Sequence, residues 1–185
     1  MFYRLSKTAS VTDVCDASYP SQHPVRLSRA VANYCDFSSY PSVEEVAAVV
    51  QSGHAVTVGI HPRHAASISD DRLAEFQALC ANPAVTGVGE VGIDHTVNSS
   101  LWRCQHIVLD QALDVLEDRH VLVFHCRSPA GSDEVFYPLI FHLRGRVDRN
   151  QRIHLYCFQG GIRKGICVTG GNSSPTPTLG SRGQL

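Results

Sequence analysis

The residue best placed to do chemistry is Glu90, near the end of the glycine-rich stretch 85–94, VTGVGEVGID. This stretch is otherwise apolar up to Asp94, which predicts a buried strand. Simple alternation along that strand puts Thr86, Val88 and Glu90 on one face. Burying a carboxylate without a partner costs several kcal/mol, so we expect Glu90 to be paired, hydrogen-bonded or bound to a cation.

Other polar side chains stand at the ends of further predicted strands. Parallel α/β folds build their sites at the carboxyl-terminal edge of the sheet, where these side chains would meet. Carboxylate and imidazole groups converging there suit a divalent metal with mixed oxygen and nitrogen ligands. A lone histidine in a strand is more often a satisfied core or surface group, so the interpretation depends on the joint placement. The candidates are His61, Glu90, Asp94, His125, Arg127, His154 and Tyr156.

Alternating strands and helices must position these residues. Strands are expected within 27–35 and at 55–60, 85–94, 121–126 and 152–158. A capping box at Ser42–Glu45 begins one helix, Ser69 begins the next, and two more are expected at 101–115 and 133–143. Successive strand ends are spaced by about the 30 residues of a βαβ unit. The pattern predicts an α/β fold, a parallel β/α array too short for a complete barrel of about 250 residues.

The chain divides into three parts by composition. Residues 1–26 have no clear period and form a poorly defined N-terminal segment, and residues 27–161 form one β/α domain. Residues 162–185 are dominated by Gly, Ser, Pro and Thr, which predicts a disordered tail.

The composition excludes several classes of function. A net charge of −1 provides no basic field to attract nucleic acid from a distance, so binding of DNA or RNA must come from a local site. The seven cysteines contain no CxxC pair, which favours buried thiols in a reducing compartment over a redox or structural zinc protein. The first residues lack the apolar core of a signal peptide, and no stretch is long enough to span a membrane. We therefore expect a cytoplasmic or nuclear protein that is not secreted.

Four blocks of sequence carry a resemblance to a known family. They are GIHP at 59–62, GVGEVGID at 87–94, FHCR at 124–127 and CFQGG at 157–161. Their types and order resemble the TatD family of metal-dependent deoxyribonucleases, over about residues 30–161. The resemblance implies a TIM-barrel-like hydrolase that uses one or two divalent cations (Mg, Mn or Zn) to cleave phosphodiester bonds in DNA or RNA.

The resemblance also implies roles for individual residues. Glu90 would be the carboxylate that bridges the metals and His125 a ligand to one of them. Asp94 and Arg127 would support the ligands, and His61 would face the substrate pocket. No membrane and no protein partner is implied.

The sequence departs from the family pattern at three positions. The opening His-x-His ligand pair occurs nowhere, Tyr156 stands where a metal-binding histidine is expected, and no aspartate follows Asp148 to serve as the last-strand ligand. His154 lies about 6–7 Å back along its strand and could substitute only if the strand slid or the metal moved. Two hypotheses follow: a TatD-like nuclease, or a catalytically inactive or truncated relative that acts as a binding or interaction module.

Overall fold

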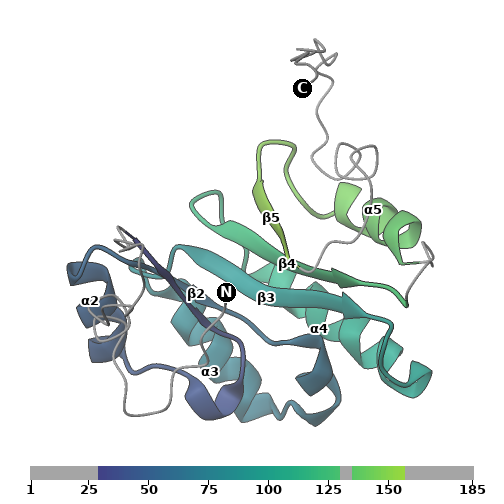
Figure 1. Ribbon diagram of the computed structural model, residues 1–185, viewed down its shortest axis with the longest axis horizontal. Coiled ribbons are helices and arrows are strands. Elements are labelled where there is room, and N and C mark those ends of the chain that lie inside the picture. Colours follow the sequence, from purple (N-terminus) through teal and green to yellow (C-terminus); the bar gives the residue numbers. More distant parts are fainter. Residues whose placement is uncertain (1–28, 130–134, 157–185) are drawn as a thin grey trace, which may run out of the picture.

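Five parallel strands form the centre of the protein. The computed structural model describes residues 29–129 and 135–156. Within them the strands pair in chain order as one parallel sheet (Figure 1). The strands are β1 (Val31–Tyr34), β2 (Ala55–Val58), β3 (Gly87–Asp94), β4 (Val121–Arg127) and β5 (Arg152–Tyr156). The predicted parallel β/α array is confirmed, and the sheet does not close on itself within these residues.

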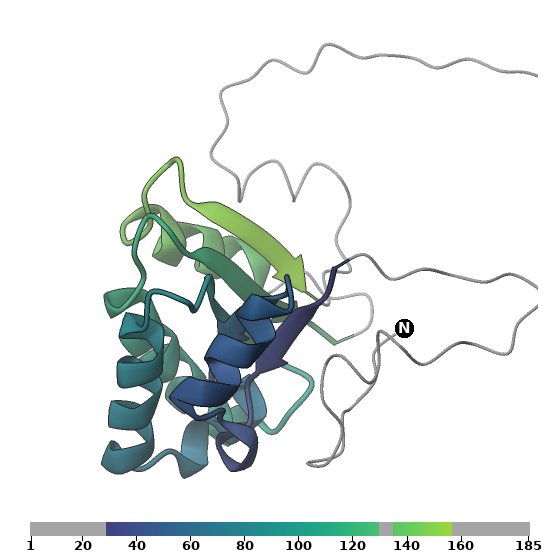
Figure 2. The same ribbon diagram turned by 90° about the vertical axis from the view of Figure 1, so that its left-hand side faces the viewer.

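One helix follows each of the first four strands, and all four helices lie on the same side of the sheet (Figure 2). Sequential strands connected this way make a singly wound arc, which is the arrangement of a TIM-barrel wall. The helices are α2 (Val43–Gln51), α3 (Asp70–Ala81), α4 (Trp102–Asp114) and α5 (Phe136–Arg144). Three 3₁₀ turns, η1 (Phe37–Ser39), η2 (Pro62–Ser67) and η3 (Ser99–Leu101), precede α2, α3 and α4.

Local sequence sets the helix starts. The Ser42 hydroxyl accepts from the Glu45 amide and the Glu45 carboxylate accepts from the Ser42 amide, so the predicted capping box is present. Ser69 caps α3 in the same way through the Arg72 amide. The helix expected at 133–143 begins at Phe136 and continues to Arg144, and Pro138 lies in its first turn, where a missing N–H is tolerated.

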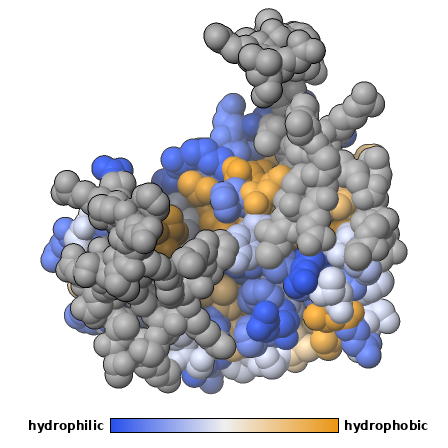
Figure 3. Space-filling model, viewed as in Figure 1, coloured by the Kyte–Doolittle hydropathy of each residue, from blue (hydrophilic) through white to orange (hydrophobic). Residues whose placement is uncertain are grey.

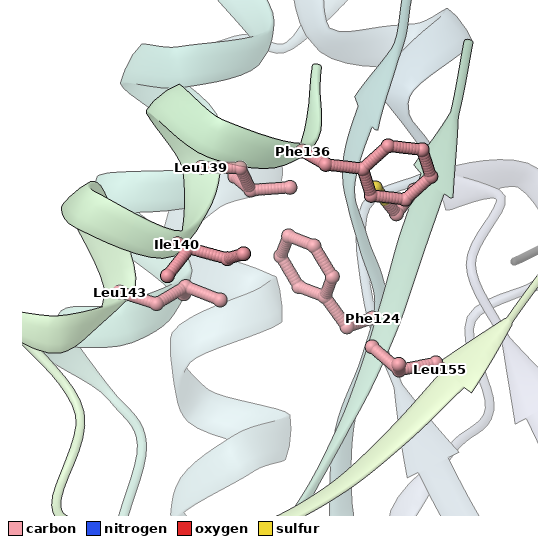
Figure 4. A pocket seen from close by; sticks show the side chains of 7 residues that line it. Phe124, Phe136, Leu139, Ile140, Leu143 and Leu155 are labelled. Carbon is pink, nitrogen blue, oxygen red and sulfur yellow. The ribbon is translucent and has the colours of Figure 1, made fainter. Parts of the chain in front are cut away.

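The hydrophobic core lies between the sheet and the helices. Figure 4 shows one end of it, where Leu139, Ile140 and Leu143 of α5 point toward Phe124 of β4 and Leu155 of β5. Elsewhere the sheet is covered by apolar side chains of the other helices. Their buried members include Val46, Val49, Phe76, Leu79, Val108, Leu109 and Ala112.

A β-bulge in β3 overturns the simple alternation expected for this strand. Val88 pairs with Leu122 and Val91 with Phe124, all four in the core, and the register shifts between Gly89 and Val91. One extra residue in a strand reverses which face the following side chains occupy. Glu90 is therefore not on the face of Val88. It lies on the opposite side, away from the helices.

The side of the sheet that carries no helix presents glycine, polar and apolar residues together. Val31, Asn33, Arg152 and His154 are exposed there, whereas Gly87 and Gly89 lie in the middle strand. Figure 3 shows hydrophobic and hydrophilic residues side by side on this face. No helix among the described residues is long and apolar enough to cross a membrane.

The segments expected at 1–26 and 162–185, and the final motif at 157–161, fall outside the described residues. The division of the chain into three parts stays a prediction.

Replacing Gly59 by alanine should destabilise the fold. An added Cβ would lie 2.2 Å from the Gly89 carbonyl carbon and 2.4 Å from the Glu90 nitrogen, so β3 must move at the position that carries Glu90. We expect the free energy of unfolding to fall by about 1–3 kcal/mol, measured by urea denaturation. Gly145→Ala is the matched control, since its nearest atom is 4.0 Å away. Equal stability of the two variants would contradict the packing described.

Replacing Arg119 by alanine should loosen the junction between α3, β3 and β4. Its guanidinium donates to the carbonyls of Cys80 at 2.9 Å, Val85 at 2.8 Å and Asn82 at 3.3 Å. We expect a loss of about 1–3 kcal/mol in the free energy of unfolding, because these carbonyls lose a charged donor.

Arg72→Ala provides the comparison, because the Arg72 side chain pairs with Glu75 on the exposed surface of α3. That variant should change stability by less than about 0.5 kcal/mol. A loss as large in Arg72→Ala as in Arg119→Ala would show that the carbonyl contacts contribute little.

Candidate functional site

Three buried side chains converge at the carboxyl-terminal edge of the sheet. His61 follows β2, Glu90 belongs to β3 and His125 to β4, and they are 9%, 4% and 2% exposed. Glu90 Oε2 lies 2.5 Å from His125 Nδ1 and 3.6 Å from His61 Nε2. One donor atom from each residue falls within 4.8 Å of the others. The sequence placed these residues at one edge, and the structure brings them into contact.

The second Glu90 oxygen accepts a hydrogen bond from a side chain of β1, two strands away in the sheet. Asn33 Nδ2 of β1 donates to Glu90 Oε1 at 3.4 Å, and Thr57 Oγ1 of β2 donates to Asn33 Oδ1 at 2.9 Å. The Thr57 bond fixes the Asn33 amide so that its nitrogen faces the carboxylate. Three strands thus orient the Glu90 carboxylate before anything binds to it.

Asp94 lies behind His125, on the other side of the ring from Glu90. Its Oδ2 is 3.4 Å from His125 Nε2, close enough for an ion pair but not aligned as a hydrogen bond. Burial pushes the pKa of Asp94 upward, but hydrogen bonds from the Thr96 hydroxyl and amide, with His125 and Arg127 nearby, leave it below its usual value. Asp94 is therefore ionised and presents a carboxylate to the histidine ring.

His61 remains neutral at physiological pH. Burial, followed by the neighbouring His125, Arg63 and His64 side chains, lowers the pKa of His61 to about 3. Its Nδ1 accepts the Arg63 backbone N–H at 3.1 Å, and its ring lies 4.7 Å from that of His125, centroid to centroid, at 68°. The His61 imidazole therefore adds no positive charge beside Glu90 and His125.

The structure separates the remaining candidates from this group. Tyr156 lies opposite His125 in the register, with ring centroids 6.1 Å apart, so it borders the site. Arg127 ends β4 opposite Asp94 and is exposed at the rim. His154 pairs with Val123, two residues back from Tyr156, and is exposed. His154 therefore does not join the His61–Glu90–His125 group.

Sequence reasoning missed several residues that position the site. Asn33, Thr57 and Thr96 are short polar residues whose partners lie on other strands or in a turn. Gln105 is 1% exposed, and its amide donates to the Asp94 carbonyl at 3.1 Å and accepts from the Asp94 N–H at 3.0 Å. A signal for Gln105 was present, because a polar residue four positions after Leu101 and four before Leu109 sits in the apolar stripe of the helix.

The nearby thiols do not suit nucleophilic chemistry. Burial raises the pKa of Cys126, next to His125, to about 12, and burial together with Glu90 raises that of Cys35 to about 11. A thiol that stays protonated is a poor nucleophile and a poor metal ligand. The chemistry of the site therefore rests on its imidazole and carboxylate groups.

These groups fit a divalent cation. Oxygen and nitrogen donors from a carboxylate and an imidazole are ligands that Mn²⁺ and Zn²⁺ accept, and the carboxylate behind His125 matches the support that metal-binding histidines usually have. The close approach of Glu90 Oε2 and His125 Nδ1 is a pair of atoms that one cation could join.

Comparison with known proteins agrees with the motifs. A model of the family described as TatD related DNase matches residues 6–172. The 3'-5' ssDNA/RNA exonuclease TatD of Musicola paradisiaca (strain Ech703) is 26% identical over 141 residues, covering 76% of this chain and 44% of that protein. The enzyme of the same name from Yersinia pseudotuberculosis serotype O:3 (strain YPIII) is 30% identical over 105 residues, 56% of this chain and 38% of its own length.

A solved structure shares the fold. The crystal structure of YJJV, a TatD homolog from Escherichia coli k12, matches with a TM-score of 0.57 at 19% identity. The match covers 75% of this chain and 51% of that protein. The chain thus spans about half the length of this structure and less than half of the curated relatives it matches. With a family match over most of its length, this chain belongs to the TatD related DNase family.

Proposed function

We propose that the protein is a metal-dependent hydrolase of phosphodiester bonds, a TatD-like nuclease acting on DNA or RNA. The observation that carries the proposal is the convergence of Glu90 and His125 at the edge of the sheet, with Asp94 behind the histidine. Family membership supplies the reaction class, and the names of the relatives, 3'-5' ssDNA/RNA exonucleases, support a nucleic acid substrate.

Glu90 and His125 would hold the cation. His125 Nδ1 and Glu90 Oε2 lie at hydrogen-bond distance, and a cation held by these two atoms would take the place of the proton between them, while Asp94 would face the Nε2 side of the ring. Asn33 keeps the Glu90 carboxylate in place through its other oxygen. A bound Mg²⁺, Mn²⁺ or Zn²⁺ would lower the pKa of a coordinated water and offset negative charge on the phosphate.

Residues at the rim would bind the substrate. Arg127 is exposed beside Asp94 and carries the positive charge that a phosphate needs, whereas the chain as a whole has a net charge of −1. Tyr156 borders His125 and would line the pocket. Nucleic acid would therefore bind through this local site and not through long-range attraction to the whole protein.

The free, buried cysteines, such as Cys80, support a location in the reducing cytoplasm or nucleus.

A second candidate function is a binding or interaction protein without turnover. The observation that favours it is the number of ligand positions that survive from the family pattern: Glu90 and His125 are present, whereas Tyr156 stands at a histidine position and the sequence contains no His-x-His pair. Catalytic zinc commonly has three protein ligands and a water. Metal binding and activity measurements decide between the two functions.

Removing a proposed ligand should abolish metal binding. In Glu90→Gln and in His125→Gln we expect Mn²⁺ affinity, measured by calorimetry, to fall by more than about 100-fold, beyond the 10–100-fold typical of supporting residues. Cleavage of a fluorescently labelled single-stranded oligonucleotide should be lost with it. His154→Gln changes the same residue type outside the group and should behave like the parent.

A folded parent that binds Mn²⁺ but cleaves neither DNA nor RNA would favour the binding protein. A folded parent without Mn²⁺ affinity would exclude the metal-dependent hydrolase.

Replacing Asp94 by asparagine should weaken the site without removing it. The change removes the charge behind His125 but keeps an acceptor for Thr96, so the loop geometry is retained. We expect Mn²⁺ affinity to drop by about 10–100-fold, again by calorimetry. An unchanged affinity would mean that Asp94 does not orient the His125 ring.

A further inference from the structure

Among the described residues, the end of β3 has a strand neighbour on one side alone. The pairing of β2 with β3 ends at Val88, whereas β4 pairs with β3 as far as Asp94. The His95 N–H donates to the Arg127 carbonyl at 2.9 Å, so the amide of residue 95 faces β4. Successive residues of a strand direct their backbone groups to opposite sides. The Asp94 N–H and carbonyl therefore face the side on which the pairing with β2 has ended.

Gln105 of α4 takes the place of a strand neighbour for Asp94. Its side-chain oxygen accepts the Asp94 N–H at 3.0 Å, and its side-chain nitrogen donates to the Asp94 carbonyl at 3.1 Å. Both residues are buried, where a backbone N–H or carbonyl needs a partner. A carboxamide offers one acceptor and a donor in the same plane, which is what an adjacent strand would provide. An apolar side chain at position 105 would leave both backbone groups of Asp94 without this partner.

The hydrogen bonds around Asp94 direct one of its oxygens at the site. Asp94 Oδ1 accepts from the Thr96 amide at 2.9 Å and from the Thr96 hydroxyl at 2.5 Å. Thr96 thus fixes the rotation of the carboxylate, and Gln105 fixes the backbone that carries it. The other oxygen, Oδ2, is then held 3.4 Å from His125 Nε2. A chain of contacts therefore runs from α4 through Asp94 to the histidine ring.

We propose that Gln105 is a positioning residue for the cation site, and that it acts on His125 through Asp94. The inference rests on the proposed function, in which Glu90 and His125 hold the cation. A carboxylate behind a metal-binding histidine orients the ring, and its loss weakens metal binding. Without the two bonds from Gln105, the backbone of Asp94 can shift and withdraw its carboxylate from the ring. The contribution of Gln105 to cation affinity therefore requires Asp94.

The variant that tests this role is Gln105→Met. Methionine is unbranched and of similar length, so it fills the same space but makes neither hydrogen bond with Asp94. We expect Mn²⁺ affinity, measured by calorimetry, to fall by about 10-fold or more. Trp102→Phe is the matched control, because it removes a hydrogen bond of the same helix, from Trp102 Nε1 to the Val97 carbonyl at 3.2 Å. Its Mn²⁺ affinity should stay within about 3-fold of the parent.

A double-mutant cycle separates positioning from a general loss of stability. In the variant that combines Gln105→Met with Asp94→Asn, we expect Mn²⁺ affinity within about 3-fold of Asp94→Asn alone, because both changes act on the same carboxylate. A further loss as large as that in Gln105→Met alone would show that Gln105 acts independently of Asp94, and would overturn the proposal. If Gln105→Met does not fold, Gln105→Glu takes its place in the cycle, since it retains an acceptor for the Asp94 N–H.

A second readout does not depend on the cation. In NMR spectra of the metal-free protein, the His125 ring resonances should shift in Gln105→Met and in Asp94→Asn but not in Trp102→Phe. Unchanged His125 resonances or unchanged Mn²⁺ affinity in Gln105→Met would overturn the positioning role and leave the proposed function intact. A folded parent without Mn²⁺ affinity would overturn the proposed function itself, and the role of Gln105 with it.

Discussion

The structure depends on the burial of one carboxylate. Glu90 is 4% exposed in the middle strand of the sheet, and a charge so placed needs partners on every side. Asn33 approaches from β1, His61 from the end of β2 and His125 from β4. Each partner comes from a different strand or from the turn that follows it, so the contacts form only when the strands pair in the observed register. The site and the sheet are consequently one cooperative unit.

The glycines of β3 make room for this arrangement. Gly89 has φ of 142° and lies against the Val123 carbonyl oxygen, where an added Cβ would be only 2.1 Å away. Any larger residue would force β3 and β4 apart beside the site. The bulge then turns Glu90 away from the helices and toward its polar partners. The backbone geometry of β3 thus determines where the carboxylate of the site lies.

The sequence predicted the order of strands and helices well, because hydrophobic runs, capping residues such as Ser42 and regular spacing are local signals. It placed Glu90 and His125 at one edge through the rule for parallel sheets. It failed on the face of Glu90, since a bulge depends on the neighbouring strand as much as on the strand itself. Asn33 could not be predicted as a partner, because its contact crosses 57 positions of sequence.

The singly wound order of the strands has a consequence for how the chain acquires its structure. Each strand pairs with the one made just before it, so every pairing closes a loop of similar length, and the entropy of closure changes only slowly with that length. During synthesis an emerging strand would therefore meet a partner that is already in place. Assembly can proceed unit by unit from the first strand, with Glu90 gaining its last partner only when β4 has been added.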